Sequence, residues 1–118
     1  MRRDWLRRLN HDVCKHVVWL ARDLAEGRSP PGARDLAALR RVWQAIPDAE
    51  GQPIGALARL TQFVEELDGD VRTAKLVACA RAADRSLAAD DPAAALAAVL
   101  ALDGELLALT ATLTLTED

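Results

Sequence analysis

Hydrophobic residues recur at steps of three and four through most of the chain. This spacing places side chains along one face of an α-helix. It is clearest between residues 3 and 26, where the pattern predicts one long amphipathic helix. The apolar positions of that segment are Leu6, Leu9, Val13, Val17, Leu20 and Leu24.

Glycine and proline divide the rest of the sequence into further helical segments. The stretch 27–32 contains two glycines and two prolines, so it predicts a tight turn that folds the second helix back on the first. Asp91 and Pro92 form a good helix opening, with aspartate as cap and proline at the first helical position. Gly104 marks a candidate kink or break, and 110–116 is expected to be a fraying helix end. The helices predicted after the first are 33–46, 53–67, 70–88 and 92–112.

Length and composition agree with an all-α fold. The chain has 118 residues, of which 51% are hydrophobic and 28% charged, enough to form a core without a metal or a disulfide. We therefore predict a single domain, 1–118, built as a compact bundle of about five helices. Its first helix is long and forms a hairpin with the second. Cys14 and Cys79 are far apart in sequence and are expected to be free thiols.

The sequence also predicts a location. No stretch approaches the roughly 18 to 20 uninterrupted apolar residues of a membrane span, and the basic start is not followed by the apolar block of a signal peptide. We expect a cytoplasmic protein without a membrane segment.

Charge is distributed unevenly between the two halves. Residues 1–59 carry 11 Lys and Arg against 7 Asp and Glu, whereas residues 60–118 carry 4 against 11, for a total charge of −3. An acidic chain with 3% aromatic residues lacks the basic surface and exposed rings that nucleic acids require, so we expect no nucleic-acid partner. The basic N-terminal half could present a local patch to an acidic partner.

Both histidines fall within the segment 10–16 of the first predicted helix. On a regular α-helix His11 points away from the apolar stripe and is expected to be exposed. His16 lies nearer the core edge, one turn from Asp12 and beside two tryptophans. The residues expected to share the outward face with His11 are Arg7, Lys15, Val18 and Arg22.

An exposed histidine followed by an acidic residue can accept a phosphoryl group, because the imidazole attacks and the carboxylate holds or withdraws its proton. The stretch 9–13 resembles the H-box of histidine-kinase dimerisation and histidine-phosphotransfer domains. This resemblance implies that His11 is the acceptor and Asp12 its acidic neighbour. Lys15 and His16 stand where many members of these families have threonine or asparagine and then proline. The chain has no room for a kinase domain, so it could only relay phosphoryl groups made elsewhere.

A metal site is a third hypothesis. His11, Cys14 and His16 are all ligand types, but His11 and Cys14 lie about 60° apart on an α-helix, and no second cluster supplies the remaining ligands. We therefore assign no metal and no cofactor.

Trp5 and Trp19 lie off the centre of the first apolar stripe. Packing against a neighbouring helix is the favoured interpretation, and anchoring of a partner or a second copy is the next. The sequence as a whole predicts a non-enzymatic interaction or regulatory module that binds a protein partner, or itself, through its first helical hairpin. The predicted binding residues are Arg7, Lys15, Val18, Arg22, Trp5 and Trp19.

Overall fold

The structure is a computed structural model that describes residues 7–27, 29–66 and 71–116. Within these ranges the side chains of residues 10, 12, 14, 71, 72 and 112–116 are not described. Every element in the described ranges is helical apart from an isolated bridge between Pro47 and Pro53, which confirms the all-α prediction. The elements are η1 (Asn10–Val18), α2 (Trp19–Glu26), α3 (Ala33–Ala45), α4 (Ala56–Glu66), α5 (Val71–Ala88) and α6 (Pro92–Thr116).

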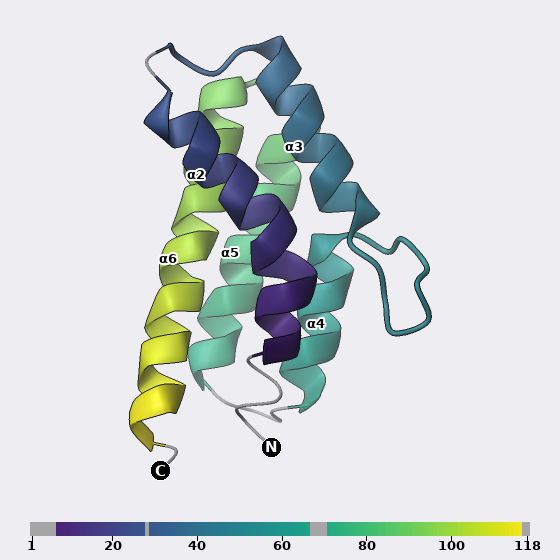
Figure 1. Ribbon diagram of the computed structural model, residues 1–118, viewed down its shortest axis with the longest axis vertical. Coiled ribbons are helices and arrows are strands. Elements are labelled where there is room, and N and C mark those ends of the chain that lie inside the picture. Colours follow the sequence, from purple (N-terminus) through teal and green to yellow (C-terminus); the bar gives the residue numbers. More distant parts are fainter. Residues whose placement is uncertain (1–6, 28, 67–70, 117–118) are drawn as a thin grey trace.

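The helices form four antiparallel columns (Figure 1). The first column is η1 continued by α2, and the second is α3 followed by α4 in the same direction, with a loop between them. α5 and α6 form the third and fourth columns and pack along one another. The arrangement is that of an up-down-up-down bundle in which the second column is interrupted.

The first column is not the single long α-helix that the sequence predicts. Its residues 10–18 form a π-helix, and the α-helical part that follows is the eight residues of α2. A π-helix closes i→i+5 hydrogen bonds, so its turn is wider and residues five apart come to lie near one another. Val13 and Val18 are both fully buried for this reason, together with Val17. The prediction that Val18 faces solvent beside His11 is therefore wrong.

The loop between α3 and α4 is ordered by Asp48 and by two glycines. The backbone amides of Glu50 and Gln52 each donate to Asp48 Oδ1 at 2.9 Å, and Gly51 has a φ of 86°, which favours glycine. The amides of residues 54 and 55 both donate to the carbonyl oxygen of Ile46 at 3.0 Å. These bonds hold residues 46–55 as a closed loop, so α4 starts at residue 56 and not at residue 53.

The last helix begins as predicted. The amide of Ala94 donates to Asp91 Oδ1 at 3.1 Å, and Pro92 is the first helical residue. α6 then continues past Gly104 without a break and extends to Thr116, because buried residues on either side of the glycine anchor the helix to α5.

One helix bears on the expectation that the chain has no membrane segment. The stretch Pro92–Ala111 of α6 is long and apolar enough to cross a membrane by length and composition, since Asp103 and Glu105 are its only charged residues. Core helices of soluble proteins have the same properties. In this structure α6 packs along α5 and also contacts the first column.

Arginine side chains tie the columns together. Arg8, in the helical turn 7–9 that precedes η1, pairs with Glu66 of α4 at 2.9 Å, and Arg22 of α2 pairs with Asp103 of α6. Arg40 of α3 donates to the carbonyl oxygens of residues 87 and 89, at the end of α5, and pairs with Asp90. These last bonds satisfy carbonyl groups that the end of a helix leaves without partners.

Candidate functional site

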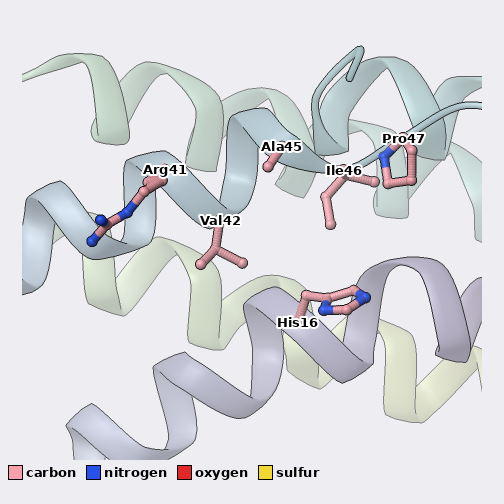
Figure 2. A pocket seen from close by; sticks show the side chains of 6 residues that line it. All are labelled: His16, Arg41, Val42, Ala45, Ile46 and Pro47. Carbon is pink, nitrogen blue, oxygen red and sulfur yellow. The ribbon is translucent and has the colours of Figure 1, made fainter. Parts of the chain in front are cut away.

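A groove lies between the first column and α3 (Figure 2). We call it the His16 groove. It has a volume of about 420 Å³, within the range of ligand pockets in proteins. The residues that line it are His16 of η1, Arg41, Val42 and Ala45 of α3, and Ile46 and Pro47.

The groove has an apolar floor and polar ends. Figure 2 shows Val42 and Ile46 projecting from α3 toward the first column, where the ring of His16 lies. The guanidinium of Arg41 extends away from His16 along α3. This arrangement can accommodate an apolar side chain between α3 and η1, with a cation at one end.

Arg41 is the one Lys, Arg, Asp or Glu residue among the described residues that line the groove. Arg34 and Arg41 of α3 and Lys15 of η1 are exposed. Within the described part of the chain, none of these three forms an ion pair. Arg41 is therefore a cation at the groove that is available to an acidic ligand, and Lys15 and Arg34 add positive charge to the same two helical columns.

The structure confirms the predicted exposure of some site residues and contradicts it for others. His11, Arg7 and Lys15 are exposed, as predicted. Arg22 does not face outward with them: it is half-buried, and its guanidinium donates to both carboxylate oxygens of Asp103, at 2.9 and 2.8 Å. The wider turn of the π-helix, which buries Val18, also rotates Arg22 toward α6.

The tryptophans divide between the core and the surface. Trp43 is buried, and its Nε1 donates to Asp84 at 3.0 Å. Trp19 is 54% exposed, so the interpretation that it packs within this chain is wrong. Trp5 and the side chains of Asp12 and Cys14 lie outside the described residues, and the expected pairing of Asp12 with His16 falls there as well.

His16 was expected at the core edge near Trp19, and sequence reasoning did not connect it with α3. The groove residues that were missed are Arg41, Val42, Ala45, Ile46 and Pro47. Val42 and Ile46 fit the apolar spacing of the predicted helix 33–46, and this spacing indicates a buried face of α3 but not a gap beside it. The alignment of this face with His16 depends on how the two columns pack.

The π-helix coincides with the segment in which both histidines occur. π-helical turns are rare and often occur at functional sites. His11 and His16 are five residues apart, so the wider turn brings them closer around the helix axis than an α-helix would. Both imidazoles are exposed on the first column.

The described side chains do not form a metal site, since no group of three or more His, Cys, Asp or Glu residues among them could hold an ion. Cys79 on α5 is partly buried and free. Burial, and after it the negative charge of Glu105, raise the pKa of its thiol above the ordinary value of 9.0. This thiol is therefore protonated near neutral pH and is a poor nucleophile.

Alkylation of Cys79 is expected to be slow at neutral pH and to keep accelerating beyond about pH 9, because the thiolate is the reacting form and the pKa of this thiol is raised. The rate of iodoacetamide modification against pH, measured on a Cys14→Ser variant, tests this. Glu105→Gln removes the second cause of the shift and should move the profile to lower pH. A profile that does not move would show that Glu105 has no influence on the thiol.

Comparisons with known proteins give no match: no protein-family model, no characterised protein and no solved structure is significantly similar to this chain.

Proposed function

We propose that this protein is a non-enzymatic interaction module that binds an acidic, amphipathic segment of a partner protein through the hairpin formed by its first column and α3. The observation that carries the proposal is the His16 groove, a mainly apolar groove of about 420 Å³ between the two arms of that hairpin. One apolar side chain of the partner would lie between Val42 and Ile46, with a carboxylate directed toward Arg41.

The chemistry of the groove supports this class of partner. Its floor is apolar, and apolar anchors that enter pockets provide much of the energy of protein recognition. The exposed cations Lys15, Arg34 and Arg41 favour acidic over basic segments and would increase the association rate at low salt.

The proposal can be tested with a designed peptide. The probe is a fluorescent helical peptide with leucines at i, i+3 or i+4, and i+7 and glutamates elsewhere, and its counterpart carries lysines in place of the glutamates. We expect the acidic peptide to bind and the basic one not to bind, as measured by fluorescence anisotropy. Binding should weaken as salt rises.

Two substitutions on α3 locate the contact. Ala45 lines the groove and is exposed, so Ala45→Arg should fill the groove and weaken binding about tenfold or more without unfolding the protein. Ala37 is also exposed on α3 but does not line the groove, so Ala37→Arg should bind as the unmodified protein does. Equal effects of the two substitutions, or equal binding of the two peptides, would exclude the His16 groove as the site.

A second candidate function is phosphoryl transfer through His11. It is supported by the exposure of His11 on the first column of an up-down bundle and by its resemblance to the H-box pattern. Incubation with a phosphorylated receiver domain or an active histidine kinase should label the protein but not the His11→Gln variant, while His16→Gln should remain labelled. Absence of acid-labile phosphate from the unmodified protein would eliminate this function.

A further inference from the structure

A second pocket lies between the end of α3, the loop that follows it, the start of α4 and α5. It has a volume of about 560 Å³, which is within the range of ligand pockets in proteins. We call it the Asp84 pocket. Its lining includes Trp43 and Gln44 of α3, residues 53–55 of the loop, Leu57 and Ala58 of α4, and Asp84 of α5.

The Asp84 pocket is separate from the His16 groove. On α3 the pocket is lined by residues 43 and 44, whereas the groove is lined by residues 41, 42 and 45. At about 100° per residue these two sets lie on nearly opposite sides of a regular helix. The two sites can therefore be changed independently.

Asp84 places a fixed negative charge in the pocket. It is the one charged residue among the described residues that line it. Its Oδ1 accepts a hydrogen bond from Nε1 of Trp43 at 3.0 Å. Trp43 is 2% exposed, so the buried indole orients the carboxylate of Asp84, which is itself exposed.

The charge of Asp84 is not neutralised by the described part of the chain, where this residue forms no ion pair. Arg40 and Asp84 both line a smaller pocket of about 160 Å³. The guanidinium of Arg40 nevertheless donates to the carbonyl oxygens of residues 87 and 89 and pairs with Asp90. These bonds hold the arginine at the end of α5, so the carboxylate of Asp84 can receive a cation from a ligand.

The other walls of the pocket are mainly apolar and are held by the fold. Leu57 and Ala58 belong to the first turn of α4. Residues 53–55 belong to the closed loop, in which the amides of residues 54 and 55 both donate to the carbonyl oxygen of Ile46. Gly55 has a φ of 91°, which favours glycine. A wall that is already ordered reduces the entropy lost when a ligand binds.

We propose that the Asp84 pocket binds a small organic amine. The protonated amino group pairs with Asp84, and an apolar body of about the size of a phenyl ring lies against residues 53–55, Leu57 and Ala58. A hydrogen bond between two charged groups is stronger than a neutral one, and the orientation of this carboxylate is already fixed. A ligand that carries a carboxylate would be repelled by Asp84.

The size of the pocket favours a free amine over the lysine of a partner protein. A lysine side chain presents the same ammonium group on a narrow alkyl chain, which would cover little of a pocket of about 560 Å³. A ring close to the amino group covers more of the apolar wall and therefore gains more from burial. An arylalkyl amine fits both the charge and the volume.

The indole N–H of Trp43 provides the measurement, because it bonds directly to Asp84. In ¹⁵N-resolved NMR spectra of the full chain, phenethylamine should shift this signal to saturation with a dissociation constant of about 1 mM. Phenylethanol has the same ring without the charge and should bind about fivefold more weakly. Phenylpropionate should not bind, and the peptide acetyl-Gly-Lys-Gly-amide should bind more weakly than phenethylamine.

Asp84→Asn separates the charge from the structural role of this residue. The amide oxygen of asparagine can still accept the hydrogen bond of Trp43, so the melting temperature should stay close to that of the unmodified protein. The affinity for phenethylamine should fall about fivefold, to that of phenylethanol. Glu65→Gln is the matched control, because Glu65 is exposed on α4 outside the pocket, and it should bind phenethylamine normally.

Several results would overturn the proposal. They are a Trp43 signal that no probe shifts, equal binding of phenethylamine and phenylethanol, unchanged amine binding by Asp84→Asn, and an equal loss in Glu65→Gln. Tighter binding of the lysine peptide than of phenethylamine would also overturn it and would assign the pocket to a partner protein. Ala45→Arg fills the His16 groove and should leave amine binding unchanged, so this proposal and the proposed function can fail independently.

Discussion

Replacing Val18 with lysine is expected to lower the free energy of unfolding by about 4 kcal/mol or more, a large part of the stability of a domain of this size. Val18 is fully buried in the first column. The substitution removes an apolar side chain from the hydrophobic core. It also places the ammonium group of lysine among apolar residues, where desolvation makes a charge costly. Urea denaturation followed by circular dichroism measures the effect.

The result distinguishes two registers of the first column. On an uninterrupted α-helix, residue 18 shares the solvent-facing side with Lys15, and a lysine there would be nearly neutral. In the π-helical register, residue 18 lies in the core beside Val13 and Val17. Ala25→Lys on the exposed side of α2 is the control and should change stability by no more than about 0.5 kcal/mol. Equal stability of the two variants would contradict the π-helical register.

The later helices were largely predictable because their signals are local. Asp91 caps the first turn of α6, and Pro92 takes the first helical position, where its lack of an amide hydrogen costs nothing. Both effects are independent of tertiary contacts. Apolar spacing and the prolines placed α3 within one residue of its observed end. The boundary that was missed, at the start of α4, depends on hydrogen bonds to Ile46 across a closed loop, which apolar spacing does not reveal.

The first column was less predictable because its register is decided by packing. Its apolar residues fit an α-helical stripe, and the same residues also bury well in a π-helix if Val18 is included. Contacts with α3, α4 and α6 select the second arrangement, and a periodicity calculated at 100° per residue does not include those contacts. The error propagated to the site, because Val18 and Arg22 were both assigned to the wrong face.

The exposure of His11 was predicted correctly, but the His16 groove was not. The groove exists because α3 and the first column leave a gap between Val42, Ile46 and His16, residues that are distant in sequence. Charge was a partial guide, since the excess of basic residues in the N-terminal half includes Arg41, which lines the groove. The cavity itself required the relative placement of two helices.

Arg22→Leu is expected to destabilise the bundle by about 3 kcal/mol, because it leaves a buried carboxylate without its partner. The side chain of Asp103 is 11% exposed, and its two oxygens accept hydrogen bonds from Arg22 at 2.8 and 2.9 Å. Without the guanidinium, this charge remains on an otherwise apolar face of α6 that packs against the first column. The cost should appear as a lower urea midpoint with an unchanged slope.

Replacing the other partner of the ion pair, Asp103, should lower the free energy of unfolding much less. Arg22 is 43% exposed, so in Asp103→Leu its guanidinium can turn toward water, and we expect a loss of about 1 kcal/mol or less. The double variant, in which both residues become leucine, should recover most of the stability lost in Arg22→Leu, since apolar residues of similar size can replace a buried ion pair. Urea unfolding of the three variants gives the coupling energy between the two positions. Equal losses in the two single variants would show that the burial of Asp103 does not determine the energetics of this contact, and the ion pair would then act only as a surface link between α2 and α6.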